Sequence, residues 1–465
     1  MFPEAGKLPP RELDSTFMAA VRKEQWQSGV GFVLAAAGSA VGLGNLWGFA
    51  YRASQGGGGS FVLLYLLVVG LICLPVLVAE MVLGRSTGHS PLLAPIKAAG
   101  QAWWPMGWMF IAASCGILAF YAVLMGWTGQ TLFHALFVGL PENKQAADAF
   151  FDALSGGNSA LAGQGISLLL TALVVAAGVQ GGIERLSRWA LPLLLVLLIG
   201  LVIWASTLPG AGEGYRTFLF RWDGAQLMNL TTIRNAFSQA FFSIGTGIGS
   251  IMAYSVYLNQ RARLPQQAAA VVGLDTSVGL LAGMLTFPVV ISFNLSDVVS
   301  DSTIGAIFIA LPTGLASIGM TGQVVAVLFF ALAYLAAITS SVSLLEVPVS
   351  SLMDRVGWSR SRATWISTAV IFVLGIPASM SLEVLGVMDA VFGNVLLMTG
   401  GLLIAVLMGW VVPTLFLNDL KDSDASSPQI RRVLIFCLQW ISPVVIAAGL
   451  LISVVDLLRT WFAAS

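Results

Sequence analysis

Eleven long stretches without a charged side chain constrain this chain more than any other feature. They are mostly apolar and cover 25–51, 53–79, 98–141, 153–183, 189–212, 235–260, 276–296, 302–345, 363–382, 390–418 and 433–455. A helix needs about 20 apolar residues to cross the roughly 30 Å of hydrocarbon in a bilayer. The pattern therefore predicts an all-α integral membrane protein with eleven transmembrane helices. The seventh span is expected to begin before Asp275, near Gln267, because 268–274 are also apolar.

Composition excludes most other classes of protein. Only 9% of the 465 residues are charged, whereas a soluble domain carries about 25%. Lys+Arg and Asp+Glu are balanced at 22 each, which argues against a nucleic-acid partner that would need a basic face. The three cysteines and two histidines stand at no spacing typical of a metal site. A metalloenzyme is therefore not expected, and no pair of nucleophile and base indicates another enzyme.

The distribution of lysine and arginine predicts the orientation in the membrane. With the N-terminus in the cytoplasm, inside segments hold sixteen of the 22 Lys and Arg residues. This bias predicts a multi-pass protein of the plasma (inner) membrane, with the C-terminus outside after eleven spans. Residues 1–26 carry both charge signs and no short apolar core, so no cleaved signal is expected.

Two spans carry several glycines at mid-membrane, within 38–45 and 242–249. Glycine recurs there every second residue, which favours a helix break over a packing face with glycine at every fourth residue. The two segments lie five spans apart and so run in opposite directions. Paired interruptions of this kind indicate a transporter built from inverted repeats, whose unwound backbone can bind ions. The predicted organisation is a cytoplasmic segment 1–26, a first repeat 27–212, a second repeat 213–418, and a loop with the last span at 419–465.

Motifs along the chain fall in the order of one known family. Residues 42–47 read Gly-Leu-Gly-Asn-Leu-Trp and 56–61 read Gly-Gly-Gly-Gly-Ser-Phe. Further matching positions are Trp26, Glu80, Gly84, Arg85, Tyr121, Trp127, Gln239, Ser243, Tyr254, Tyr257, Thr339, Ser340 and Ser341. Over residues 22–415 the chain resembles the neurotransmitter:sodium symporter family, and most closely its bacterial amino-acid transporters. The resemblance implies a five-plus-five inverted repeat with broken helices 1 and 6.

The resemblance also implies two sodium sites beside the substrate. The first would be formed by the Ala40 carbonyl, the side chains of Asn45 and Asp275, the hydroxyl and carbonyl of Ser243, and the substrate carboxylate. The second would be formed by the carbonyls of Gly38, Val41 and Ala336 and the hydroxyls of Thr339 and Ser340. These are the oxygen ligands that hard cations prefer. Taken singly, the hydroxyls could bond their own helix backbone, and Asn45 could join neighbouring helices.

Asp275 is an acid deep within a span, which marks it as a functional candidate. Many family members have asparagine at this position and need chloride, or an acid one turn further on, to balance the sodium charge. In this chain the position one turn after Asp275 is Gly279, which has neither a carboxylate nor a hydroxyl. The other residues of the family's chloride site, Tyr65, Gln239 and Ser243, are present. We expect Asp275 to supply the negative charge and transport to be independent of chloride. The alternative is a structural ion pair within the bundle.

The resemblance places an amino acid between the two breaks. The amides of Leu43 and Gly44 and the Tyr121 hydroxyl would bind its carboxylate, and the carbonyls of Ala40, Phe242 and Ser243 its ammonium group. The side-chain subsite would consist of Val41, Ile117, Gly245, Ile248, Ser340 and Leu344, under a lid of Tyr121 and Phe242. The monoamine carriers of the family have aspartate at the position of Gly42, so this glycine favours an amino acid. The apolar subsite favours neutral, hydrophobic side chains, unless these residues only pack helices together.

The gates depart from the family pattern. The outer-gate arginine is replaced by Gly48, and Asp389 remains as its acidic partner; Arg52, one helical turn further on, is the expected substitute. Arg52 could instead be a solvated charge at the membrane edge. At the inner gate the matches are Trp26, Tyr257 and Asp354, with Lys23 in place of arginine. Lysine cannot form the bidentate carboxylate pair, and Lys23 could simply mark the cytoplasmic end of the span.

The sequence thus predicts a sodium-coupled symporter of neutral, hydrophobic amino acids that works by alternating access in a lipid bilayer. Alternatives within transport are proton coupling or an osmolyte substrate. An alternative from another class is a sodium-independent receptor that transports nothing. The sequence leaves the oligomeric state open.

Overall fold

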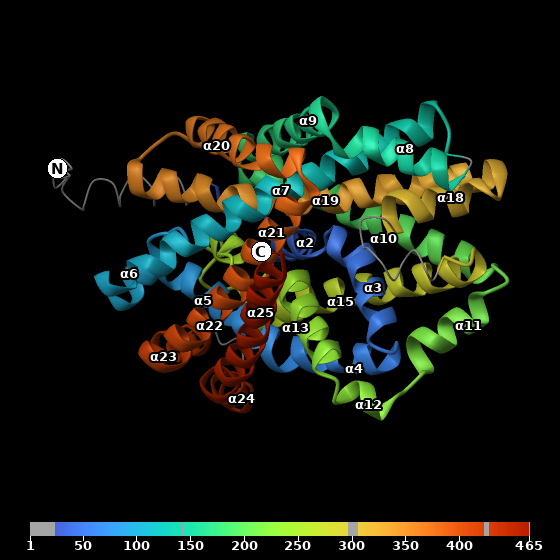
Figure 1. The fold of residues 1–465 in the computed structure, drawn as a ribbon. Coiled ribbons are helices and arrows are strands. Elements are labelled where there is room, and N and C mark those ends of the chain that lie inside the picture. The colour runs from blue at the N-terminus through green and yellow to red at the C-terminus, as the bar shows by residue number, and fades with distance from the viewer. Residues whose placement is uncertain (1–23, 142, 296–305, 423–426, 465) are drawn as a thin grey trace.

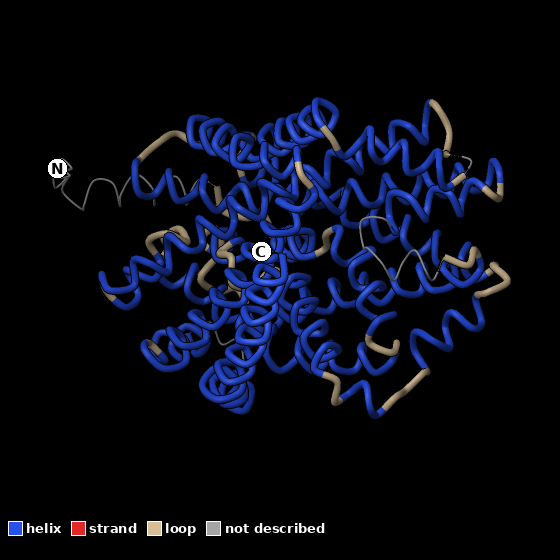
Figure 2. Tube along the Cα trace, viewed as in Figure 1, coloured by secondary structure: helices blue, strands red, loops and turns tan. Residues whose placement is uncertain are grey.

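The computed structural model describes residues 24–141, 143–295, 306–422 and 427–464, and in these ranges the chain forms helices and no strand. Figure 2 shows helices connected by short loops throughout the described part. The α-helices are α2 (Gly29–Ala40), α3 (Phe49–Gln55), α4 (Gly59–Val68), α5 (Leu74–Thr87), α6 (Ala94–Ala99), α7 (Trp104–Phe137), α8 (Lys144–Ser155), α9 (Gly157–Ala176), α10 (Arg185–Ser206), α11 (Ala211–Tyr215), α12 (Gly224–Leu227), α13 (Leu230–Ile244), α14 (Ser250–Ser255), α15 (Leu264–Ser292), α18 (Leu311–Ala316), α19 (Gly319–Val356), α20 (Arg360–Met380), α21 (Leu382–Met388), α22 (Leu397–Val406), α23 (Pro413–Asp422), α24 (Pro428–Phe436) and α25 (Ser442–Ala464). Short π-helical turns continue several of them, among them Gly44–Gly48 before α3 and Asp389–Leu396 before α22.

Nine helical segments of the described chain are long and apolar enough to cross a membrane. They are Gly59–Thr87, Gln101–Phe137, Gly157–Ala176, Val179–Ser206, Leu264–Ser292, Gly319–Val356, Arg360–Met380, Leu382–Val411 and Pro428–Val455. The bent pair Gly29–Ala40 and Gly44–Gln55 makes a tenth candidate. The remaining predicted span, 235–260, coincides with α13 and α14, which are each too short to span alone. The count of eleven therefore stays a prediction.

The first predicted break is present. Helix α2 ends at Ala40, and Val41 adopts an extended conformation with ψ 104°. The helix resumes at Gly44 with its axis bent by 69°. The two glycines in this segment, Gly42 and Gly44, stand where a β-carbon would meet Tyr121 and Phe242 at 3.0 and 2.7 Å. Small residues are therefore needed here for close contact.

The second predicted break is also present, between α13 and α14. Gly245, Gly247 and Gly249 have positive φ angles of 66°, 96° and 81°, a region that side chains with a β-carbon rarely adopt. The fully buried Glu80 of α5 accepts hydrogen bonds from the backbone amides of Gly247 at 3.0 Å and Met252 at 3.2 Å. This carboxylate satisfies donors that the missing helical turn leaves unpaired.

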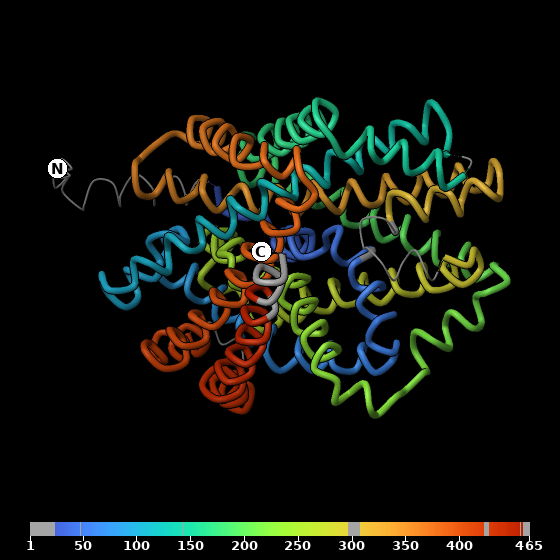
Figure 3. Tube along the Cα trace, viewed as in Figure 1, coloured from blue at the N-terminus to red at the C-terminus, as the bar shows by residue number. Residues whose placement is uncertain are grey.

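The broken helices lie in the middle of the molecule, surrounded by continuous ones. The long helices α7 and α19 pack against each other, with α9 and α20 along the same side (Figure 1). Helices α10, α15 and α19 pack against α2, and α25 packs against α22. Figure 3 shows that segments from both halves of the chain, blue and yellow-green, meet at this centre. The arrangement brings α2, α7, α13, α15 and α19 around one site.

Candidate functional site

A small cavity of about 40 Å³ lies between the two helix breaks. Its lining residues come from α2, α7, α13, α19, α22, the two breaks and the π-helical turn Gly44–Gly48. They are Ser39, Ala40, Gly42, Asn45, Ile117, Tyr121, Phe242, Gly245, Ile248, Ser340, Ser343, Leu344 and Leu397. Most of this surface is apolar, and no acidic or basic side chain is among the lining residues. The cavity is therefore small in this conformation and suited to neutral groups.

Polar groups converge on one end of the cavity, at the first break. The Leu43 amide donates to the Tyr121 hydroxyl at 3.2 Å, and the Gly42 amide donates to Asn45 Oδ1 at 3.1 Å. The helix Gly44–Gln55 begins here, so its positive dipole end faces the same region. Amides and a helix N-terminus together form an environment that binds a carboxylate.

A first cluster of oxygen ligands joins three elements beside this end. Asn45 Nδ2 donates to Ser243 Oγ at 2.7 Å and to Asp275 Oδ1 at 2.6 Å, and Ser243 Oγ donates to Asp275 Oδ2 at 2.7 Å. The Tyr65 hydroxyl lies 3.4 Å from Asp275 Oδ2. All four side chains are buried. The structure thus brings together the three side chains predicted for the first sodium site. Ala40, whose carbonyl was predicted as the fourth protein ligand residue, lines the adjoining cavity.

A second cluster joins α19 to the end of α2. Ser340 Oγ lies 3.4 Å from the Gly38 carbonyl oxygen, 3.0 Å from that of Val41 and 3.2 Å from that of Ala336. Thr339 Oγ1 lies 3.0 Å from the Ala336 carbonyl oxygen. All five residues predicted for the second sodium site therefore meet at one point, although Gly38 and Val41 lie about 300 residues before Ser340 along the chain.

Of the thirteen residues predicted to bind substrate, nine line the cavity. The other four lie beside it: Val41 is fully buried, Leu43 and Gly44 line the outer cavity described below, and Ser243 belongs to the first cluster. The lining residues that we did not predict are Ser39, Ser343 and Leu397. The two serines carried a signal, because Ser39 precedes the predicted Ala40 and Ser343 follows Ser340 by three residues on one helix face.

An outer cavity of about 320 Å³ lies on the other side of Tyr121 and Phe242, which line both cavities. Arg52 and Asp389 line it as well. Arg52 Nη1 donates to Gln239 Oε1 at 2.5 Å, and in the described chain no hydrogen bond or ion pair joins it to Asp389. Arg52 is thus a half-buried group of the outer cavity that is hydrogen-bonded to Gln239.

The segment before α2 is fastened to the bundle at the opposite end. The Trp26 indole donates to the Tyr254 carbonyl at 2.9 Å, and the Gln27 amide donates to Glu184 at 3.0 Å. Arg360 binds Glu24 at 2.6 Å and the fully buried Glu346 at 2.7 Å. The described start of the chain is therefore held against α14, the π-helical turn Val179–Glu184 before α10, and α20.

This arrangement differs from the predicted inner gate. Tyr257 takes part as predicted, since it donates to Glu346 at 3.0 Å and lies 3.0 Å from Arg360 Nη2. Asp354 lies elsewhere and accepts from the Ser90 amide and hydroxyl, both at 2.8 Å, and contacts His89. Lys23 lies outside the described residues. The sequence did not predict the contact of Arg360 with Glu24 and Glu346. These residues lie on separate elements, and the local sequence of α19 or α20 does not show which charges meet.

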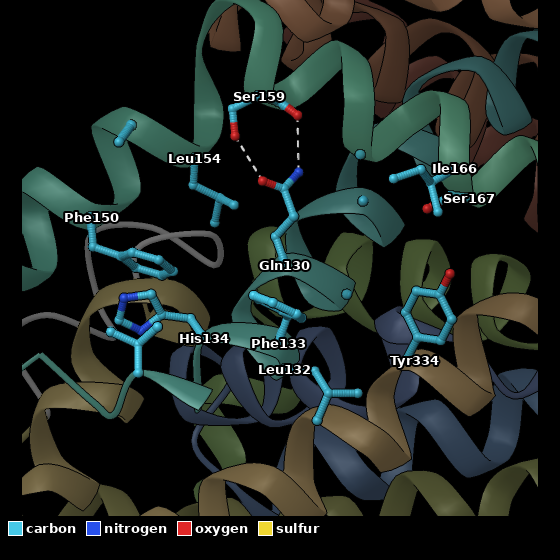
Figure 4. Close-up of a pocket in the computed structure, with 15 residues that line it drawn as sticks. Gln130, Leu132, Phe133, His134, Phe150, Leu154, Ser159, Ile166, Ser167 and Tyr334 are labelled. Atoms are coloured by element: carbon cyan, nitrogen blue, oxygen red, sulfur yellow. Dashed lines mark hydrogen bonds between the residues drawn. The ribbon is translucent and has the colours of Figure 1, made fainter. Parts of the chain in front are cut away.

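A larger cavity of about 520 Å³ lies between α7, α8, α9 and α19 (Figure 4). In Figure 4 the Gln130 amide points to Ser159, with bonds of 3.0 and 2.7 Å, and the His134 ring lies beside Phe150. None of the predicted substrate, sodium or gate residues lines it. This cavity is larger than the central one, but its size alone does not make it the substrate site.

Comparison with known proteins agrees with this geometry. The sequence model of the Sodium:neurotransmitter symporter family matches residues 23–151 and 159–463. The chain belongs to this family. A sodium-dependent transporter of Bacillus subtilis, YhdH, is 36% identical over 84% of this chain and 88% of the relative. One of Methanocaldococcus jannaschii is 31% identical over 77% of this chain and 75% of the relative.

A solved structure shares the fold. The crystal structure of MhsT in complex with L-phenylalanine superposes with a TM-score of 0.84 at 37% identity, covering 92% of this chain and 99% of MhsT. The family consists of integral membrane symporters and not of enzymes. This family member is accordingly a sodium-dependent membrane transporter, and the predicted resemblance is confirmed.

Proposed function

We propose that the chain is a symporter that couples sodium entry to the uptake of neutral, hydrophobic amino acids, without a requirement for chloride. The observation that carries the proposal is the pair of oxygen clusters beside a small cavity between two helix breaks. MhsT, whose structure contains L-phenylalanine, and the sodium-dependent nutrient amino acid transporter 1 of Drosophila grimshawi, 25% identical, support an amino-acid substrate.

The substrate's backbone groups would bind at the broken helices. The amides of Leu43 and Gly44 and the Tyr121 hydroxyl suit a carboxylate, and the carbonyls of Ala40, Phe242 and Ser243 suit an ammonium group. A β-carbon at Gly42 would lie 3.0 Å from the Tyr121 hydroxyl. There is thus no room for the acidic side chain that would pair with a substrate lacking a carboxylate.

Sodium supplies the positive charge that the substrate carboxylate needs in a buried site. In the first cluster, the Ser243 hydroxyl and the Asp275 carboxylate offer oxygens 2.7 Å apart. The Asn45 amide donates to both through its nitrogen, and its own oxygen accepts from the Gly42 amide. In the second, Ser340 and Thr339 hold their hydroxyls next to three backbone carbonyls. Because Ser243 serves both the ion and the substrate, each ligand raises the affinity for the other, and this coupling is reciprocal.

The chloride requirement is proposed to be absent because of Asp275. Its carboxylate lies 2.6 Å from Asn45 Nδ2 and so provides a negative charge at the first cluster. The position one turn later, Gly279, adjoins the Phe49 ring and offers no hydroxyl. Gln239 is occupied by Arg52 and by the Gly44 carbonyl at 3.2 Å.

Alternating access would use two closures. On the outer side, Tyr121 and Phe242 separate the two cavities, and Arg52 bonded to Gln239 ties α3 to α13 above them. On the inner side, Arg360 ties Glu24 to α19 and α20. Release to the cytoplasm would require the segment at Glu24 to leave Arg360.

The spans would number eleven, with α13 and α14 together as the sixth, and the N-terminus would lie in the cytoplasm.

The test is binding of radiolabelled amino acids to the purified full chain in detergent, in sodium, potassium and choline chloride and in sodium gluconate. Binding of a hydrophobic amino acid only with sodium, and equally in gluconate, is the expected result. Binding without sodium would refute the ion clusters and favour a proton-coupled carrier or a receptor. Sodium-dependent binding of a betaine instead of an amino acid would refute the substrate class.

A further inference from the structure

Two serine hydroxyls interrupt the otherwise apolar wall of the central cavity. Ser39 Oγ of α2 donates to Ser343 Oγ of α19 at 2.6 Å, and Ser343 Oγ donates to the Ser340 carbonyl at 2.8 Å. Both residues line the cavity, together with the apolar side chains of Ile117, Ile248 and Leu344. Neither belongs to the two oxygen clusters.

The direction of these two hydrogen bonds determines whether the serine pair can donate to a ligand or only accept from it. Both hydroxyl protons are used within the protein, whereas a hydroxyl oxygen can accept two hydrogen bonds. Within the described part of the chain, no hydrogen bond is donated to Ser39 Oγ. The pair therefore presents an acceptor to the cavity and no free donor. An acceptor in an apolar, water-poor surrounding interacts more strongly with a donor than it does in water.

We propose that Ser39, held in place by Ser343, is a specificity-determining residue that accepts a hydrogen bond from the far end of the substrate's side chain. The inference rests on the proposed function and narrows its substrate class. The preferred substrates are aromatic amino acids with a neutral donor on the ring, which are tyrosine and tryptophan.

The chemistry of the cavity excludes the other donors. A lysine or arginine side chain would need a counter-charge, and no acidic residue lines the cavity. A short polar side chain would leave Ile117, Ile248 and Leu344 without an apolar partner. Gly245 provides space for a ring, because a β-carbon there would meet only Ile248 Cδ1, at 3.9 Å.

The same geometry predicts a moderate selectivity. A site whose own donors become unpaired rejects a substrate that lacks the matching group very strongly. Here the serine protons stay satisfied when phenylalanine binds, so only one added hydrogen bond distinguishes tyrosine. The net value of such a bond corresponds to about a 3- to 10-fold tighter binding of tyrosine. Phenylalanine is then a weaker ligand that is still accepted.

The experiment compares tyrosine with 4-fluorophenylalanine, which has a similar shape and no donor at the ring end. Both are measured by sodium-dependent displacement of labelled phenylalanine from the full chain in detergent. The parent protein should prefer tyrosine by about 3- to 10-fold. The variants Ser39→Ala and Ser39→Cys should both bring this ratio close to one, because sulfur is a weak acceptor.

The matched control is Ser341→Ala, which removes a buried hydroxyl of α19, the helix of Ser343. This hydroxyl bonds Thr171 of α9 and does not line the cavity. Its tyrosine ratio should equal that of the parent. A parent ratio near one, or an unchanged ratio in both Ser39 variants, would overturn the inference. A protein that binds no labelled phenylalanine in sodium would instead refute the proposed function, so the two failures are distinguishable.

Discussion

Replacing Asp275 by asparagine tests the charge balance of the first cluster. The two side chains have the same shape, but asparagine is neutral and one of its two terminal atoms is a donor. Asp275 accepts from both Asn45 Nδ2 and Ser243 Oγ, at 2.6 and 2.7 Å. Asparagine can accept only one of these bonds well. The change therefore removes a charge and mismatches one hydrogen bond without opening a cavity.

The loss of charge sets the size of the effect. Two unit charges about 4 Å apart attract each other by about 4 kcal/mol at an effective dielectric constant of about 20. This corresponds to about a 1,000-fold change in a dissociation constant. Because the asparagine oxygen can still bind a cation, we expect sodium affinity in gluconate to fall by about 100- to 1,000-fold.

The assay is sodium titration of amino-acid binding, in chloride and in gluconate, with the sodium-dependent rise in melting temperature as a second readout. The parent protein should give the same sodium affinity in both salts. Asp275→Asn should lose most of its sodium-dependent rise in gluconate. The control Ser277→Ala alters an exposed hydroxyl on the same helix that bonds only the Gly273 carbonyl, and it should behave as the parent does. Unchanged sodium affinity of Asp275→Asn in gluconate, or a parent that needs chloride, would refute the reasoning.

Three further substitutions probe the second cluster, the inner closure and the substrate's backbone subsite. Ser340→Ala removes the hydroxyl shared by three carbonyls, so the Hill coefficient for sodium should fall towards one; a coefficient unchanged from the parent would contradict a second site. Arg360→Ala leaves Glu346 buried without its partner, which should lower the free energy of unfolding by about 3–5 kcal/mol. The double variant Arg360→Ala, Glu346→Gln should recover part of this loss in a thermal-stability assay. Gly42→Ala places a methyl group 3.0 Å from the Tyr121 hydroxyl and 3.1 Å from Ser340 Oγ. Overpacking by this methyl group costs about 1–3 kcal/mol and should weaken phenylalanine binding by about 5- to 150-fold. Equal binding would show that the substrate carboxylate lies elsewhere.

The sequence predicted the features that depend on local composition. Apolar runs long enough to span, and glycines at mid-membrane, act within one segment, and the breaks after Ala40 and Ile244 are where the glycines indicated. The residues of both oxygen clusters were also predicted, through their order and spacing along the family. The cavity-lining Ser39 and Ser343 were missed, because serine within a helix usually bonds its own backbone.

What only the tertiary structure decided are the pairings between distant polar groups. Arg360 binds Glu24, 336 residues away, and Glu346 on the preceding helix. The sequence analysis had expected Asp354 and Lys23 at the inner gate, and Lys23 lies outside the described residues. In a bilayer, buried charges are stable only next to a partner, but the identity of that partner depends on the depth and rotation at which each helix packs. Local apolar pattern determines that a segment spans the membrane and where it breaks, whereas the packing of neighbouring helices determines which charges and hydroxyls meet.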